Sequence, residues 1–188
     1  MNDPFDHLFE RLRALDEEIA NGWAFRALLK DLGGRKVEAF QPQLFAIWMA
    51  RAAILRALIS SVMACLDKKG TDRAGVGQIL HVLEPMVAEF DSTAFQRAKD
   101  TYEAVVESDA YARGKRLRDE VAHILIRNEP TVPVQYETYY ELHDKAQQIT
   151  IDLFQACDIG RPNFLTQEDA LLAGAKTFWD NYIKGMPK

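Results

Sequence analysis

An arginine and a histidine five residues apart are the side chains of this sequence best suited to chemistry. Arg118 and His123 lie in KRLRDEVAHILIRNEP, residues 115–130, whose first half is basic. Histidine titrates near neutral pH, so it can take a proton from a hydroxyl group or give one to a leaving oxygen. Arginine stays charged and offers a planar fork of N–H groups to a phosphate as charge develops there. Together these residue types fit acid–base chemistry at a phosphate group.

The spacing of the apolar residues predicts that this segment is a helix, over about residues 110–127. At about 100° per residue, its apolar side chains share one face: Leu117, Val121, Ile124 and Leu125. Its polar side chains form a stripe on the far side: Arg116, Asp119, His123 and Arg127. Arg118 lies at the flank. Because Ala122 and Ile126 lie beside His123, we expect a second surface to pack there.

The spacing of Arg118 and His123 is not specific by itself. The sequence holds 13 arginines and four histidines in 188 residues, so one such spacing arises readily by chance. The alternative is a surface histidine that pairs with Asp119 one turn earlier. A choice between the two interpretations needs the surrounding residues.

The string LRDEVAHI, residues 117–124, resembles the signature of HEPN domains, an arginine followed by a polar residue and, after a short gap, a histidine. The resemblance is closest to the abortive-infection U-type branch of that family. That branch has an apolar helix with a tryptophan that leads into a Leu-Asp turn, similar to Trp48 to Leu66-Asp67 here. It also has a long helix after the motif, similar to YYELHDKAQQITIDLFQAC. The resemblance extends over residues 1–160, but only the motif is specific.

This resemblance implies a homodimer in which the motif helices of two copies face each other across a cleft. It implies a metal-independent ribonuclease without cofactors, acting as a toxin or phage-defence effector, and leaves room for an antitoxin or another neutralising partner. Arg118 and His123 would be catalytic, and Asp119 would fix the tautomer of the imidazole. Basic side chains would hold the RNA backbone without reading bases, namely Lys115, Arg116 and Arg127.

The sequence departs from the family in one respect, and one other function class stays open. Some HEPN toxins carry a modified tyrosine two residues after the histidine, where this chain has Leu125. Regulation by modification at that place is therefore in doubt. Some HEPN proteins are also non-catalytic, so the chain could instead bind nucleotide, RNA or a protein partner through the same face.

Other residue patterns in the sequence are weaker indications of chemistry than the Arg118–His123 motif. Glu120-x-x-His123 has the spacing of half a di-iron site, but the sequence has no second Glu-x-x-His. We expect structural roles or none for His7, His81 and His143. The three tryptophans are expected to anchor the core or an interface, and the YETYY run, residues 136–140, to pack.

The elements that must position the motif are all helical. Turn residues divide the chain into about six helices, so we predict an all-α, antiparallel, HEPN-like bundle with a decorating C-terminal helix, a single domain over residues 1–188. Asp91-Ser92 is predicted to begin one helix, Asp158 to Gly160 to end another, and Thr138 and Thr166 to cap two more.

Composition narrows the class of protein. A net charge of −5 argues against a protein that coats nucleic acid by bulk charge, although a local basic patch suffices for a small site. Cys65 and Cys157 are interpreted as reduced core residues of a cytoplasmic protein. The stretch 44–66 is long enough to span a membrane, but Arg51 and Arg56 in its interior favour a core helix.

Overall fold

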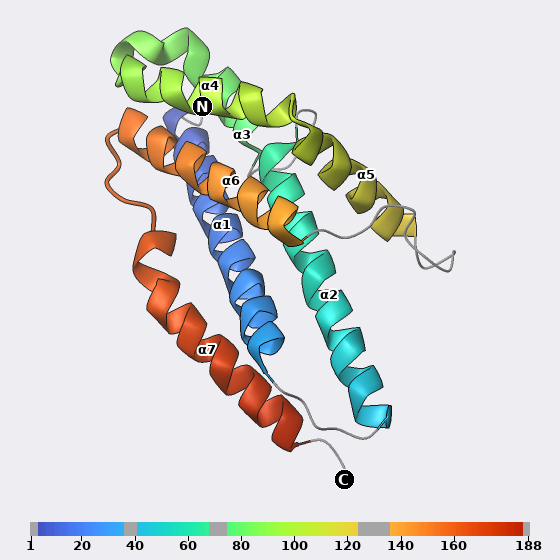
Figure 1. The fold of residues 1–188 in the computed structure, drawn as a ribbon. Coiled ribbons are helices and arrows are strands. Elements are labelled where there is room, and N and C mark those ends of the chain that lie inside the picture. The colour runs from blue at the N-terminus through green and yellow to red at the C-terminus, as the bar shows by residue number, and fades with distance from the viewer. Residues whose placement is uncertain (1–3, 36–40, 68–74, 124–135, 186–188) are drawn as a thin grey trace.

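The computed structural model describes residues 4–35, 41–67, 75–123 and 136–185, with side chains except at 4–6, 41, 42 and 120–123. These residues form seven α-helices and one 3-10 helix and contain no strand, which confirms the predicted all-α bundle (Figure 1). The elements are α1 (Pro4–Gly34), α2 (Gln41–Leu66), α3 (Val76–Leu83), the 3-10 helix η1 (Glu84–Glu89), α4 (Ser92–Val106), α5 (Asp109–His123), α6 (Tyr136–Ala156) and α7 (Phe164–Lys184).

Helix α1 is the centre of the bundle. It packs against α2, α6 and α7. Its apolar residues recur every three or four positions, which places them on one face, and four of them are fully buried: Leu8, Leu12, Leu15 and Ile19. The stripe continues to Leu32, and α1 ends at Gly34.

The two halves of α2 have different surroundings. Its C-terminal half contributes Leu58, Ile59, Val62 and Met63 to the core, and Ser61 donates a 2.9 Å hydrogen bond to the Glu18 carbonyl of α1. In its N-terminal half, large apolar side chains are exposed to solvent. By length and composition, Gln43–Leu66 could cross a membrane, but 44% of the stretch is buried inside the structure. Core helices of soluble bundles have the same properties, so this is weak evidence for a span.

Helices α4 and α6 form a long antiparallel pair. Asp91 caps α4 as predicted, because its carboxylate accepts the N–H groups of Thr93 and Ala94 at 2.9 and 3.1 Å. Arg97 of α4 donates to the buried Asp152 of α6 at 3.1 Å. The chain leaves α6 through two residues with left-handed backbone, Asp158 at φ 51° and Gly160 at φ 83°. This confirms the predicted end of that helix.

Helix α7 lies along α1 and runs parallel to it (Figure 1). The N-terminus of α7 is held by Asp16 of α1, whose buried carboxylate accepts the N–H groups of Asn163 and Phe164 at 3.0 and 3.1 Å. At the other end, Arg35 donates to Asp180 at 2.6 Å. Between these points the fully buried Trp179 donates to the Leu28 carbonyl at 2.8 Å. The helix begins at Phe164, so the prediction that Thr166 caps it is wrong.

The cap predicted at Thr138 is also wrong. Residues from Tyr136 onward are already helical, and Thr138 is buried inside α6. Both wrong caps have the same cause. A threonine followed three residues later by an acidic residue occurs inside helices as well as at their first residue.

Candidate functional site

Helix α5, which carries the motif, packs against α2 and α6 through three residues on one face. Tyr111 and Leu117 are buried. Between them Gly114 allows a close approach, because a Cβ atom there would lie 3.0 Å from the Met63 sulfur and 3.2 Å from Leu142. Arg118 directly follows the last of these residues. It therefore lies at the edge of the contact between α5 and the C-terminal end of α2.

Arg118 is bonded to a carboxylate on each side. Its Nη1 donates to Asp67 just after α2 at 2.8 Å. Its Nε and Nη2 both donate to one oxygen of Asp119 at 3.1 Å. The Arg118 side chain is 28% exposed, compared with 20% for Asp67 and 55% for Asp119. The guanidinium is thus fixed in direction while one edge stays near solvent.

These bonds leave part of the guanidinium available. Arginine has five N–H groups, and three of them donate here, so two have no partner among the described residues. The hydrogen bond to Asp67, followed by that to Asp119, raises the pKa of Arg118 above its usual value, and burial opposes the rise. The side chain is therefore a permanent cation with two N–H groups that no described residue occupies.

The two carboxylates differ in what they can contribute. Asp119 is more than half exposed, and ion pairs of this kind are weak, so a phosphate can displace it. Asp67 is more shielded and holds Nη1 from the opposite side. We therefore assign to Asp67 the orientation of Arg118, and to Asp119 a bond that an incoming anion can replace.

The remaining predicted site residues lie on α5 or beyond it. Lys115 and Arg116 are exposed, which suits contact with a nucleic-acid backbone. His123 is the last residue of α5, one turn after Asp119, but its side chain lies outside the described residues. Arg127 also lies outside them. The structure thus brings Arg118 and Asp119 together and leaves the geometry of His123 untested.

Asp67 is the member of this site to which sequence reasoning assigned no role. It stands 51 positions before Arg118, at the end of an apolar helix. In the sequence, the Leu66-Asp67 turn is distinctive only through the family resemblance. A single carboxylate after an apolar helix is a weak signal, since only the packing of α5 on α2 makes it a partner of Arg118.

Metal-binding groups and cysteine thiols are the other side chains of chemical interest. Among the described residues, no group of three or more His, Cys, Asp or Glu side chains could hold a metal ion. Cys65 and Cys157 are both buried and unpaired, and burial raises the pKa of each thiol, that of Cys157 to about 11. These thiols are therefore protonated and unreactive at neutral pH.

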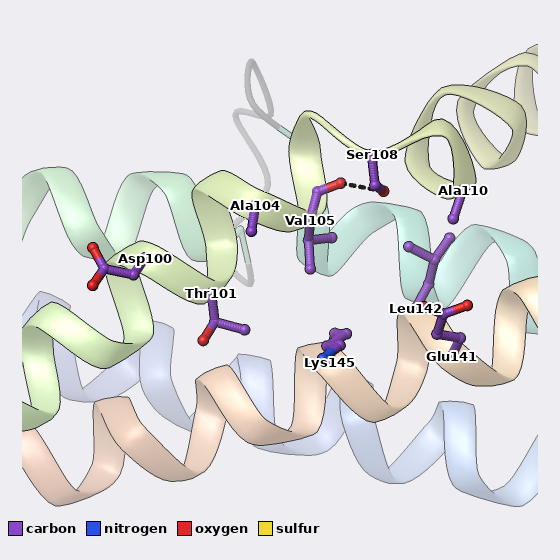
Figure 2. A pocket seen from close by; sticks show the side chains of 9 residues that line it. All are labelled: Asp100, Thr101, Ala104, Val105, Ser108, Ala110, Glu141, Leu142 and Lys145. Atoms are coloured by element: carbon purple, nitrogen blue, oxygen red, sulfur yellow. Dashed lines mark hydrogen bonds between the residues drawn. The ribbon is translucent and has the colours of Figure 1, made fainter.

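A groove lies between α4 and α6, apart from the Arg118 site. Figure 2 shows Asp100 and Thr101 of α4 on one side of it and Glu141 and Lys145 of α6 on the other. Its cavity volume is about 400 Å³, and its lining comprises Asp100, Thr101, Ala104, Val105, Ser108, Ala110, Glu141, Leu142 and Lys145. None of these residues belongs to the predicted site. Its charged side chains are exposed, so the groove is an open surface feature.

Comparison with protein families, with characterised proteins and with solved structures finds no match for this chain.

Proposed function

We propose that this chain is a cytoplasmic, metal-independent endoribonuclease of a toxin or phage-defence system, with an HEPN-type site that two copies share. The observation that carries the proposal is the state of Arg118, a fixed cation with two N–H groups without described partners. It stands in a basic stretch with Lys115 and Arg116, five residues before His123. This combination suits the binding of a phosphodiester.

The proposed reaction is an internal transfer of the phosphoryl group. The ribose 2′-oxygen forms a bond to phosphorus as the bond from phosphorus to the 5′-oxygen breaks. One neutral imidazole takes the proton from the 2′-hydroxyl, and one imidazolium gives a proton to the leaving 5′-oxygen. The products are a 2′,3′-cyclic phosphate and a 5′-hydroxyl. Arg118 stabilises the negative charge on the phosphoryl oxygens during transfer.

A shared site follows from the number of groups that the reaction needs. Acid and base act at the same time on opposite oxygens, but each motif supplies a single histidine, His123. A two-fold axis between two α5 helices would bring a second one. Asp119 lies one turn before His123. Once a phosphate binds the guanidinium of Arg118, the Asp119 carboxylate is proposed to accept a hydrogen bond from the imidazole of His123 in place of those from Arg118.

The bonds of Arg118 also favour a second candidate. Because Asp67 and Asp119 already occupy three of its N–H groups, Arg118 can serve to lock α5 onto α2. The chain would then be a non-catalytic binding module for RNA, nucleotide or a protein partner.

The decisive experiment is RNA cleavage in EDTA with analysis of the product ends. We expect cyclic phosphate and 5′-hydroxyl ends from the native protein. Arg118→Ala and His123→Ala should each slow cleavage by roughly 10²–10⁴-fold without loss of helicity. Arg118→Lys should fail as well, because a lysine offers no planar fork.

Matched controls are available on α1. Arg13→Ala and His7→Ala remove the same residue types from exposed positions and should leave cleavage unchanged. Cleavage that requires Mg²⁺, or that survives in His123→Ala, would show the mechanism to be wrong. Binding of RNA without cleavage by the native protein would favour the second candidate.

A further inference from the structure

The outer face of the N-terminal half of α2 is apolar and uncovered. Phe45 is 64% exposed and Trp48 is 61% exposed. Leu44 and Met49 are also exposed, at 41% and 47%. The rings of Phe45 and Trp48 stack on each other, with centroids 6.2 Å apart and an interplanar angle of 28°. We call these four residues the α2 patch.

The composition around the α2 patch is that of a protein interface. Trp, Phe, Met and Arg are enriched at such interfaces, and acidic residues are depleted. No Asp or Glu occurs in residues 41–66, whereas Arg51 and Arg56 are exposed beside the patch. The guanidinium of Arg51 lies 5.0 Å from the centroid of the Tyr136 ring, so it already covers an aromatic face.

We infer that a second copy of this chain covers the α2 patch, in the same two-fold interface that pairs the motif helices. This inference rests on the proposed function for the pairing of the two sites. In Figure 1, α2 and α5 lie along one side of the molecule and α7 lies along the other. Met63 of α2, which Gly114 of α5 approaches closely, is 18 residues from Phe45, or five helical turns, so α5 packs on the face of α2 that carries the patch. A copy that approaches α5 from outside therefore also approaches the patch.

The motif helix cannot supply the apolar centre of such an interface. The exposed described residues of α5 are charged, except for one alanine: Asp109, Ala112, Arg113, Lys115, Arg116 and Asp119. A stable interface covers about 800 Å² on each partner, with an apolar core. Since an aromatic side chain has about 150–250 Å² to bury, the exposed parts of the α2 patch offer roughly 400 Å². The patch thus supplies about half of the required area.

The face of α2 that carries the patch continues beyond it toward the C-terminal end of the helix. Phe45 and Arg56 are eleven residues apart, about three helical turns, so they share one face of α2. Between them lie Ala52, half-buried, and Ala53, exposed. These small side chains leave room there for large side chains of the partner copy. The guanidinium of Arg56, which is exposed, can lie on an aromatic ring of the partner.

The inference is tested by sedimentation velocity over a wide range of protein concentration. We expect the native protein to be a dimer. Trp48→Glu should raise the dissociation constant by at least ~30-fold, since buried tryptophans dominate interface energies, and Phe45→Glu should act in the same direction. Leu172→Glu, at a position of α7 that is 43% exposed, should leave the dimer intact. Circular dichroism checks that each variant keeps its helices.

Three results would overturn the inference: a monomeric native protein, a dimer that Trp48→Glu does not weaken, or binding of the native monomer to phosphatidylserine vesicles through Trp48. Cleavage assays on the same samples separate this inference from the proposed function. A dimer that Trp48→Glu dissociates but that never cleaves RNA keeps the interface and rejects the ribonuclease. A native protein that cleaves RNA, but whose dimer Trp48→Glu does not weaken, keeps the ribonuclease and rejects this interface.

Discussion

The two carboxylates that accept hydrogen bonds from Arg118 differ in exposure, and their effects on stability should differ accordingly. Asp67→Asn keeps the shape of the side chain but removes its charge beside a partly buried cation, so we expect a loss of about 1 kcal/mol. Asp119→Asn, at an exposed position, should cost less than ~0.5 kcal/mol. Chemical denaturation measures both. In an Arg118→Ala background the loss on Asp67→Asn should become smaller, and an unchanged loss would contradict the pairing.

His143 is a buried histidine held in its neutral form. Its Nε2 lies 3.1 Å from the Ile19 carbonyl, which can only accept, so Nε2 carries the proton. Its Nδ1 then accepts from Gln147 at 2.8 Å. Burial lowers the pKa of His143 from 6.5 to about 4, with a smaller opposing effect from the bond to Ile19. The expected structural role of this residue is therefore confirmed.

This pKa makes the stability of the fold depend on pH. Between pH 6.5 and about 4 the unfolded chain protonates His143 while the folded protein does not. The unfolded state binds more protons there, so the free energy of unfolding falls as pH falls, by up to about 3 kcal/mol from this group. Unfolding measured at several pH values should show this fall. It should be absent in His143→Gln and present in His7→Gln, whose exposed side chain is the matched control.

At the scale of elements, two helical glycines should respond in opposite ways to the same substitution. A Cβ atom on Gly22 of α1 would lie 2.5 Å from His143 Nε2. Gly22→Ala should therefore destabilise the protein by about 1–3 kcal/mol through overpacking. Gly174 of α7 has open space around it, so Gly174→Ala should stabilise by up to about 1 kcal/mol. Thermal unfolding of both variants tests the pair, and a stable Gly22→Ala protein would contradict the close approach.

The helices themselves could be predicted from the sequence, whereas some of their ends could not. The apolar period and residues such as Asp91 and Gly160 predict local structure because they act on their own segment. The start of α7 depends instead on Asp16, whose carboxylate comes from α1 and lies 147 positions away. No local pattern can show such a cap.

The same distinction applies to the candidate site. The period of α5 was sufficient to place Arg118 at the flank of the helix and Asp119 on its exposed side. The role of Asp67 could not be predicted, because it arises only where α5 crosses the end of α2.

At the scale of the whole molecule, hydropathy could not show which parts of α2 are covered. The helix is apolar almost all round, so its sequence predicts a core helix along its full length. From the sequence, the tryptophans are expected to anchor the core or an interface; Trp179 is fully buried in the core, whereas Trp48 is 61% exposed. In Figure 1, α5 and α6 meet α2 toward its C-terminal end, whereas the N-terminal turns of α2 extend beyond them.

The attachment of α7 has a consequence for the order in which the protein opens. This helix packs chiefly on α1 and is held at its ends by Asp16 and Arg35. It can therefore open as a cooperative unit while α4 and α6 stay folded. Amide hydrogen exchange should show α7 as the faster unit. Asp16→Ala removes a cap worth about 1 kcal/mol, so it should speed exchange in α7 by roughly fivefold and leave α4 unchanged.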